Sequence, residues 1–234
     1  MRIWVVSELF HPEEVSTGYV MTQIAETLSE KVDVGVICGP PKYQSDVFKA
    51  KYTLSDQIIL KRISIPKFNK NRIVTRILNF ALLTLAIGIK VLVNVKPEDK
   101  VVLVTNPPTL LPVIAVLKRL RRFKLVVIVH DVFPDNAVSG GILKKNTFIY
   151  KVLANIFNWA YKTADKLITV GSDMQELIYS KVGTSYSVKV ITNWADHDEI
   201  FPIQNSSFSD NYPVNLANKI IIQFAGNIGR VQGL

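Results

Sequence analysis

A histidine and an aspartate stand side by side where an apolar run ends, in Val129-His-Asp-Val-Phe-Pro-Asp135. At the carboxyl end of a strand, an imidazole and a carboxylate can supply a base and an anchor for sugar hydroxyls. His130 is therefore a candidate catalytic residue and Asp131 a candidate binding residue. A histidine that faces the core and is satisfied by the backbone explains the same pattern, and Asp131 can equally cap the following loop.

A long loop with one glycine follows the apolar run Ile3–Val6 and ends in Thr17 and Gly18. It lacks the Gly-x-Gly-x-x-Gly spacing of a dinucleotide site. We expect a substrate-contacting loop, in which Ser16 or Thr17 caps a helix and Gly18 permits close backbone contact. The neighbouring pair Glu13-Glu14 is expected in a solvated turn and not as two paired catalytic carboxylates.

The last sixteen residues, 219–234, read as a buried strand that runs into a glycine-rich turn containing Gly226, Gly229 and Arg230. Such a turn brings backbone N–H groups close to phosphate oxygens, and a following helix normally completes the site. No residues remain for that helix. We interpret the chain as one whole domain followed by the opening strand of a second.

Composition favours a soluble, cytoplasmic α/β protein. Of the 234 residues, 48% are hydrophobic and 20% are charged, which suits one large core. Cys38 is the single cysteine, and the three histidines lack metal-ligand spacing, so no metal is expected. The few apolar residues before Ser7 are too short for the core of a signal peptide.

Positive charge is concentrated in two segments of this chain, whose formal net charge is +9. Residues 42–76 contain nine Lys or Arg and two acids, and residues 118–124 contain five Lys or Arg and no acid. Such segments attract anionic partners, although solubility alone explains the counts as well. Nucleic acid is not expected, because no binding motif or interleaved aromatic residues accompany the charge.

Continuous apolar runs bounded by turn signals predict strands that are covered on both faces. A more alternating run at Ile58–Ile65 suggests an edge strand. Because helical patterns separate the runs, we predict a doubly wound parallel sheet with ligands beyond the carboxyl ends of its strands. The predicted strands are Ile3–Val6, Val32–Cys38, Val101–Val104, Leu125–Val129, Leu167–Val170, Val188–Ile191 and Ile220–Phe224.

Helices are predicted from apolar residues at helical spacing. One stripe contains Val20, Ile24 and Leu28. Ser172 and Gln175 form the pattern of a capping box for a helix that starts at Asp173. A second stripe contains Ile149, Val152, Leu153, Ile156, Phe157 and Ala160.

The apolar run Ile77–Ile89 is too short to span a membrane, which takes about 20 residues. It fits a buried core helix. The basic residues upstream leave a second interpretation open, an amphipathic element that rests on an anionic membrane surface.

Several motifs together resemble glycosyltransferase family 4. Members of that family are nucleotide-sugar-dependent, retaining enzymes of the GT-B fold, which is built from two Rossmann-like domains. The segments Thr105–Pro108 and Asn193-Trp194 are most similar to the branch that assembles bacterial capsule, O-antigen, lipopolysaccharide and exopolysaccharide units. The family motifs, in chain order, are His130–Pro134, Ala164–Ser172, Val188–Asp196 and Phe224–Leu234.

The resemblance implies a role for each matched residue. His130 would lie beside the transferred sugar, and Thr17, Gly18 and Asp131 would lie near the acceptor. The residues implied at the donor and its diphosphate are Ser172, Asn193, Gly226, Gly229 and Arg230.

The sequence departs from the family pattern at three positions. A single glycine stands at Gly18, Trp194 replaces a glycine, and Gln232 replaces a diphosphate-binding lysine. Arg230 could supply the missing positive charge.

The resemblance also implies the domains and the activity. Residues 1–200 would form the acceptor-side domain, 201–218 a mobile linker, and 219–234 the start of the donor-side domain. The enzyme would transfer a hexosyl or N-acetylhexosaminyl group, without a metal, from a nucleotide sugar to a polyprenyl-diphosphate-linked or other glycan, on the cytoplasmic face of an anionic membrane. The fragment alone would be inactive. A sugar-nucleotide 2-epimerase of the same fold and a non-catalytic acceptor-binding domain remain alternatives.

Overall fold

The computed structural model describes residues 1–13, 15–41, 53–65 and 73–194. By packing, the chain divides into Met1–Asn193 and Trp194–Leu234, and all the described helices and strands belong to the first unit. The predicted linker at 201–218, the strand at Ile220–Phe224 and the glycine-rich turn lie outside the described residues. The predicted domain boundaries therefore stay predictions.

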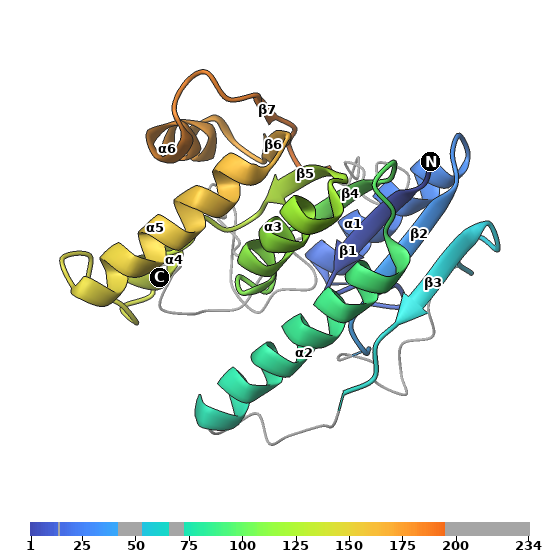
Figure 1. Ribbon diagram of the computed structural model, residues 1–234, viewed down its shortest axis with the longest axis horizontal. Helices are drawn as coiled ribbons and strands as arrows, with labels where there is room; N and C mark the ends of the chain where they lie inside the picture. Colours follow the sequence, from blue (N-terminus) through green and yellow to red (C-terminus); the bar gives the residue numbers. More distant parts are fainter. Residues whose placement is uncertain (14, 42–52, 66–72, 195–234) are drawn as a thin grey trace, which may run out of the picture. The chain divides into compact units, whose positions relative to one another are not determined.

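The described strands form one sheet in the order β3-β2-β1-β4-β5-β6-β7 (Figure 1). Every neighbouring pair is parallel, and β3 lies at an edge, as the alternating pattern of that segment predicted. The predicted α/β doubly wound sheet is confirmed. The strands are β1 Ile3–Ser7, β2 Val34–Cys38, β3 Ile58–Arg62, β4 Lys100–Val104, β5 Lys124–Val129, β6 Lys166–Thr169 and β7 Val188–Val190.

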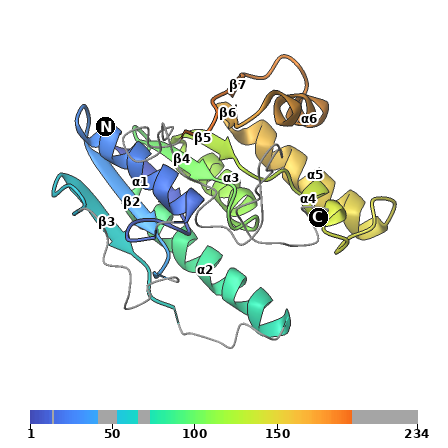
Figure 2. The ribbon, with the colours of Figure 1, turned by 180° about the vertical axis from the view of Figure 1, so that it is seen from behind.

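Helices cover both faces of the sheet. Figures 1 and 2 show α2, α3 and α5 side by side on one face and α1 on the other. This distribution follows from right-handed crossovers, because the chain moves outward from β1 to β3 and then returns to β4 beside β1. The helices are α1 Ser16–Ser29, α2 Ile73–Asn94, α3 Leu110–Arg121, α4 Asp135–Ser139, α5 Phe148–Thr163 and α6 Ser172–Val182.

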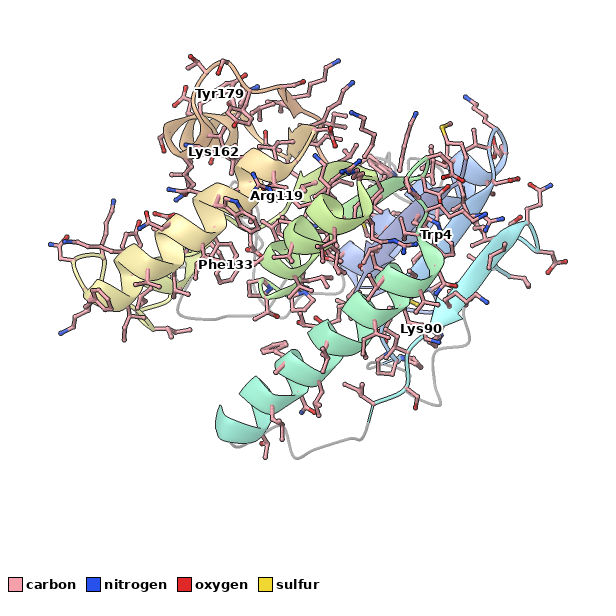
Figure 3. The ribbon with its side chains drawn as sticks, viewed as in Figure 1. Trp4, Lys90, Arg119, Phe133, Lys162 and Tyr179 are labelled. Carbon is pink, nitrogen blue, oxygen red and sulfur yellow. The ribbon has the colours of Figure 1, made fainter. Side chains whose placement is uncertain are left out.

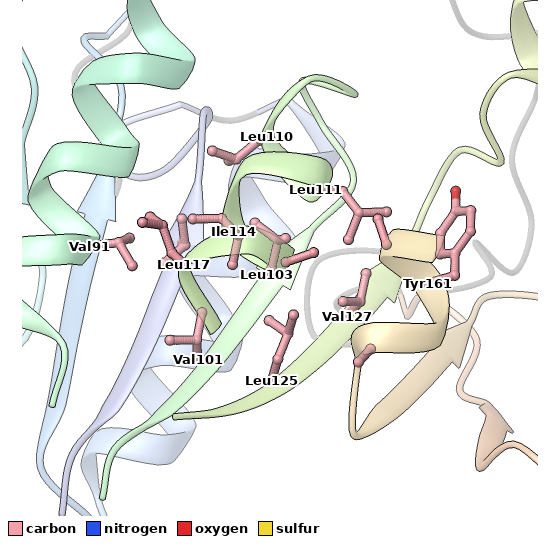
Figure 4. Close-up of a cluster of buried hydrophobic side chains, with 14 of the residues drawn as sticks. Val91, Val101, Leu103, Leu110, Leu111, Ile114, Leu117, Leu125, Val127 and Tyr161 are labelled. Atoms are coloured by element: carbon pink, nitrogen blue, oxygen red, sulfur yellow. The ribbon is translucent and has the colours of Figure 1, made fainter. Parts of the chain in front are cut away.

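Each face of the sheet has its own apolar core. The larger core lies between the sheet and α2, α3 and α5, where Leu103, Leu111 and Ile114 are fully buried (Figure 4). The smaller core lies beneath α1 and includes Phe10 and Met21. Burial on both faces explains why the inner strands are apolar throughout and do not alternate.

A buried carboxylate ties the amino-terminal ends of β1 and β4 together. Asp99 accepts hydrogen bonds from the backbone N–H of Arg2 at 2.7 Å, from Trp4 Nε1 at 3.1 Å and from the Lys96 N–H at 3.0 Å. Burial alone would raise the pKa of Asp99, but these three donors outweigh it and lower that pKa. The Trp4 ring fits because Gly35 has no side chain, since a Cβ there would lie 2.5 Å from the ring.

The predicted helix caps are wrong. Helix α1 begins at Ser16 after Val15, and no side chain bonds its first turn. Helix α6 begins at Ser172 itself, again without a side-chain cap, and Gln175 Nε2 instead donates to the Val188 carbonyl at 3.0 Å. At α6 this tertiary contact engages the Gln175 side chain that the predicted capping box requires.

Two predicted apolar stripes are only partly buried. The Ile77–Ile89 run belongs to the longer helix α2, whose inner side chains, such as Leu83 and Ile87, lie in the core as the core-helix interpretation required. Leu85 and Ile89 on the same helix are exposed. In the predicted α5 stripe, Phe157 and Ala160 are buried, and the exposed members are Ile149, Val152 and Ile156.

In α1 the buried face is shifted relative to the predicted stripe of Val20, Ile24 and Leu28. Val20 is buried, whereas Ile24 and Leu28 are only partly buried. The centre of the face is formed instead by small or polar residues, which an apolar pattern does not include. These are Gly18, Thr22, Ala25 and Ser29, together with Met21.

Candidate functional site

Four of the loops that leave the carboxyl edge of the sheet lie near the predicted site residues. They follow β1 (residues 8–15), β4 (105–109), β5 (130–134) and β6 (170–171). The strand order reverses direction between β1 and β4, and ligands of open parallel sheets bind outside the carboxyl ends of the strands at such a point. The candidate site is therefore this edge, as the sequence predicted.

His130 is held at this edge by the neighbouring loop. The buried hydroxyl oxygen Thr105 Oγ1 accepts hydrogen bonds from the backbone N–H groups of His130 and Asp131, each at 3.1 Å. The side chain of His130 is half-buried. Its Nε2 atom is buried and has no hydrogen-bond partner among the residues that the structure describes.

The surroundings keep the His130 ring neutral. Burial lowers the pKa of His130, and the adjacent Asp131 only partly opposes this effect. Burial likewise raises the pKa of Asp131, with His130 acting in the opposite direction. A neutral imidazole with an unbonded nitrogen can accept a hydrogen bond from a hydroxyl group.

Asp131 braces the short helix that follows. Its Oδ1 accepts a hydrogen bond from Asn136 Nδ2 at 2.6 Å, so the loop-bracing role left open by the sequence is present. The backbone N–H of Phe133 donates to the buried Tyr161 hydroxyl at 3.3 Å. The Phe133 ring, labelled in Figure 3, stacks on Phe157 with centroids 5.7 Å apart. The loop after β5 is thus fastened to both α4 and α5.

Helix α4 is anchored through its first residue. Asp135 forms an ion pair with Lys181 of α6 and accepts a hydrogen bond from the Tyr150 hydroxyl at 3.0 Å. Burial raises the pKa of Asp135, but Lys181 and Tyr150 together outweigh that effect and lower the pKa. The carboxylate therefore stays charged and links three helices.

The loop after β1 packs tightly against α1. Thr22 Oγ1 donates to the Gly18 carbonyl at 2.7 Å and accepts the His11 N–H at 2.9 Å. A Cβ at Gly18 would lie 2.7 Å from the Glu13 carbonyl oxygen, so glycine is needed for this close approach. Glu13 is 5% exposed, and the predicted solvated turn is therefore wrong at this residue.

Arg62 belongs to this edge and not to a free basic surface. Its guanidinium donates to the backbone carbonyls of His11 and Gly39, which lie in the loops after β1 and β2. Burial, assisted by the Arg62 charge, lowers the pKa of His11. One member of the basic segment 42–76 thus fixes loops at the candidate site.

The basic segment 118–124 is also partly engaged inside the molecule. Lys118 Nζ lies 2.8 Å from Asp165 Oδ2, and Arg121 Nη2 donates to the Val95 carbonyl at 3.1 Å. Lys124 Nζ lies 3.3 Å from the other oxygen of Asp165. Three of the five Lys and Arg side chains in this segment therefore have partners within the domain.

Four of the remaining predicted site residues lie in segments that follow β1, β6 and β7. Thr17 and Gly18 lie in the first turn of α1, Ser172 is the exposed first residue of α6, and Asn193 is exposed after β7. The implied diphosphate residues Gly226, Gly229 and Arg230 lie outside the described residues. Their roles, like those of the other predicted site residues, stay predictions.

Sequence reasoning missed Thr105 and Tyr161 as positioning residues. Thr105 follows β4, whose Val104 pairs with Ile128 of β5, so aligning the two strands would have placed it beside the His130 loop. The sequence around Tyr161 does not indicate a positioning role, because the helical spacing of its apolar neighbours marks this residue only as part of a buried helix face.

The described part of the chain contains neither a candidate metal site nor a candidate membrane-spanning helix. No three His, Cys, Asp or Glu side chains there are grouped closely enough to hold a metal ion. None of its helices is long and apolar enough to cross a membrane.

Strand order, helix placement and the position of the site define the first domain as a Rossmann-like domain of the GT-B type. Residues 17–199 match the model of Glycosyltransferase Family 4, and the chain belongs to that family. It is 32% identical over 233 residues to the probable glycosyltransferase WbjE of Pseudomonas aeruginosa. The match covers 100% of this chain and 57% of that relative, so the chain spans little more than half of its length.

Solved structures support the fold. Sucrose-phosphate synthase from Thermosynechococcus elongatus matches with a TM-score of 0.57 and 13% identity, over 91% of this chain and 53% of that one. A trehalose-6-phosphate protein from E. coli, bound with UDP-2-fluoro glucose, matches with a TM-score of 0.54 and 12% identity. This match covers 85% of this chain and 50% of that one. HepE from Anabaena, in complex with UDP, matches with a TM-score of 0.50 and 16% identity. This match covers 85% of this chain and 45% of that one.

Proposed function

We propose that this chain is the acceptor-side part of a retaining glycosyltransferase. The enzyme moves a sugar from a nucleoside diphosphate to a glycan carried on a polyprenyl diphosphate, in the synthesis of a bacterial surface polysaccharide. Membership of the family and similarity to WbjE support transfer as the reaction class. The UDP and UDP-sugar in the structures of similar fold support a nucleotide-sugar donor.

The observation that carries this proposal is the state of His130. Its backbone is fixed by Thr105, its ring is kept neutral by burial, and its Nε2 atom has no partner among the described residues. We assign this nitrogen to accept a hydrogen bond from a hydroxyl of the transferred sugar, because the residue follows β5 at the carboxyl edge of the sheet. Asp131 and the loop at Thr17 and Gly18 are assigned to the acceptor.

On the donor side, Ser172 and Asn193 are assigned to the nucleotide sugar, and Gly226, Gly229 and Arg230 to its diphosphate. The bond between the anomeric carbon and the phosphate oxygen breaks while the acceptor oxygen bonds to the same face. The acceptor proton passes to the departing phosphate. Fixed donors and Arg230 stabilise the charge that builds up on that group, so the mechanism requires no metal.

The acceptor also sets the proposed location. A polyprenyl diphosphate keeps its head group at the cytoplasmic face of the membrane, so the enzyme works as a peripheral protein on the inner face of the plasma membrane. The negative charge of that surface suits a chain with a formal net charge of +9.

The test compares His130→Ala and His130→Gln in a protein extended to the length of the WbjE relative. We expect His130→Ala to lower kcat by about 10²-fold or more with little change in the thermal midpoint, because the missing contact belongs to the reacting sugar. His130→Gln restores a hydrogen-bond acceptor and should recover part of the rate. Residues 1–234 alone should show no transfer.

Three outcomes would count against the proposal. Unchanged turnover in His130→Ala would return this histidine to a structural role. Acceptor binding without transfer by the extended protein would favour a non-catalytic acceptor-binding domain. Inversion at C2 of the donor sugar, without transfer, would favour an epimerase.

A further inference from the structure

Helices α2, α3 and α5 carry apolar side chains on the face turned away from the sheet. Their inner side chains, among them Leu83 and Phe157, lie in the larger core. Five of the outer side chains expose 60% or more of their surface, and side chains of this kind seldom gather in number on a soluble protein unless they bind something. We call the following set the outer apolar surface: Leu78, Leu85, Ile89, Leu92, Val93, Val116, Leu120, Phe148, Ile149, Val152 and Ile156.

The three helices pack as one layer, so these side chains form one surface. Gly88 of α2 lies so close to α3 that a Cβ would be 3.1 Å from Val113 Cγ1. On the other side of α3, the guanidinium of Arg119 lies over the Trp159 ring of α5, 5.7 Å from its centroid. Figures 1 and 2 show the same arrangement from both sides, with α3 between α2 and α5.

The charged side chains of these three helices are all positive. The three helices contain seven Lys or Arg and no Asp or Glu. Lys118 and Arg121 are engaged internally, as described above, whereas Lys90, Lys151 and Lys162 are exposed. Figure 3 labels Lys90 on α2, Arg119 on α3 and Lys162 on α5. A partner of this surface must therefore accept both apolar side chains and positive charge.

These two requirements select among partners. A second copy of the chain would bring like charges together across the interface. Nucleic acid would match the charge but leave the apolar side chains in water. An anionic bilayer satisfies both, because its acyl boundary takes up apolar side chains while its phosphate groups attract Lys and Arg. We propose that the outer apolar surface docks on an anionic lipid bilayer, with α2, α3 and α5 lying along the membrane.

The length of α2 relates this surface to the candidate site. A helix of 22 residues is about 33 Å long, whereas a strand of five residues is about 17 Å long. Because α2 ends only a few residues before β4 begins, its excess length extends beyond the carboxyl edge of the sheet (Figure 1). His130 follows β5 at that same edge. The membrane surface thus reaches the edge at which the acceptor is assigned. Only the link between this surface and the acceptor rests on the proposed function, because docking on a membrane requires neither the sugar donor nor the sugar acceptor.

The test measures flotation of residues 1–234 with vesicles of phosphatidylcholine alone or mixed with phosphatidylglycerol, at low and high salt. We expect binding to the anionic vesicles and weak binding to the neutral ones. Leu85→Glu/Ile89→Glu and Phe148→Glu/Ile149→Glu should each lower the partition coefficient by about tenfold or more, because each removes two inserted side chains and adds two negative charges. Salt should weaken binding without abolishing it.

A matched control separates this surface from general hydrophobicity. Ile89 and Ile191 are both 51% exposed, but Ile191 follows β7 and lies outside the layer. Ile191→Glu should bind as the unsubstituted chain does, and circular dichroism should show all variants folded. Equal losses for Ile89→Glu and Ile191→Glu would overturn the proposal, as would the absence of vesicle binding. A dimer that the α2 and α5 substitutions dissociate would assign the surface to a second copy and also overturn it.

Discussion

Thr105 Oγ1 accepts two consecutive backbone N–H groups, those of His130 and Asp131, at the point where β5 ends. The sequence left His130 between a core histidine satisfied by the backbone and a ligand-facing base. The structure shows the backbone contact and leaves the role of the ring a prediction. The backbone of His130 is satisfied by Thr105, whereas its ring nitrogen Nε2 bonds to none of the described residues. The two hydrogen bonds to Thr105 therefore fix the backbone of the loop that carries the ring and not the ring itself.

Replacement of Thr105 by valine tests this positioning. Thr105→Val keeps the volume but removes the acceptor, leaving two backbone donors unsatisfied at a cost of about 1–3 kcal/mol each where water cannot reach them. Hydrogen exchange of the His130 and Asp131 amides should become faster. Thr105→Ser keeps the hydroxyl and should leave both amides protected, although it loses a packed methyl group. Equal protection in Thr105→Val would show that another group holds the loop.

The protonation of His130 gives a second test at this scale. Because burial lowers its pKa, an NMR titration should place the pKa of His130 below the usual value of about 6.5. The unfolded chain then binds the proton more readily than the folded one. Protonation therefore favours unfolding, and stability should fall as pH decreases below about 6.5. In His130→Gln this contribution to the pH dependence of stability should disappear. A measured pKa of His130 above 6.5 would contradict the conclusion that burial dominates its surroundings.

At the scale of single elements, the sequence predicted where strands and helices lie but not how the helices begin. Apolar runs located six of the seven described strands to within two or three residues, because burial on both faces leaves an unbroken signal, and the alternating pattern at Ile58–Ile65 located β3. Capping patterns failed at α1 and α6, since short polar side chains have several competing partners. The buried face of α1 was also misjudged, because Gly18 and Thr22 are buried there without being apolar.

Gly18 shows how a tertiary contact overrides helix propensity. Alanine is favoured over glycine in a helix by about 1 kcal/mol, yet its Cβ would lie 2.7 Å from the Glu13 carbonyl oxygen. We expect Gly18→Ala to destabilise the domain by about 1–3 kcal/mol in urea unfolding, because the loop after β1 must shift. Thr27→Ala, at an exposed position of the same helix, should be neutral or slightly stabilising. A stabilised Gly18→Ala would show that the loop yields without cost.

For the whole molecule, the doubly wound topology followed from the alternation of strands and helices, and so did the edge that holds the candidate site. The loops at that edge could not be built from the sequence. Their geometry depends on pairs far apart in the chain, such as Thr105 with His130 or Arg62 with His11. Nor could periodicity show that an apolar helix is exposed on one side. Burial is a property of the assembled layer, and α2 is apolar on both its inner and outer faces.

The domain should fold without the residues that follow it. Among the described residues, both cores are assembled from residues between Trp4 and Val188, and the last strand of the sheet is β7, within the unit Met1–Asn193. We therefore expect a chain shortened to residues 1–193 to unfold cooperatively, with a thermal midpoint within a few degrees of that of residues 1–234. Amides of β1, β4 and β5 should remain the slowest to exchange, because these strands lie at the centre of the sheet. A shortened chain that loses cooperative unfolding would show that residues 194–234 complete the domain. If only the exchange of β6 and β7 increased, their contribution would be confined to that end of the sheet.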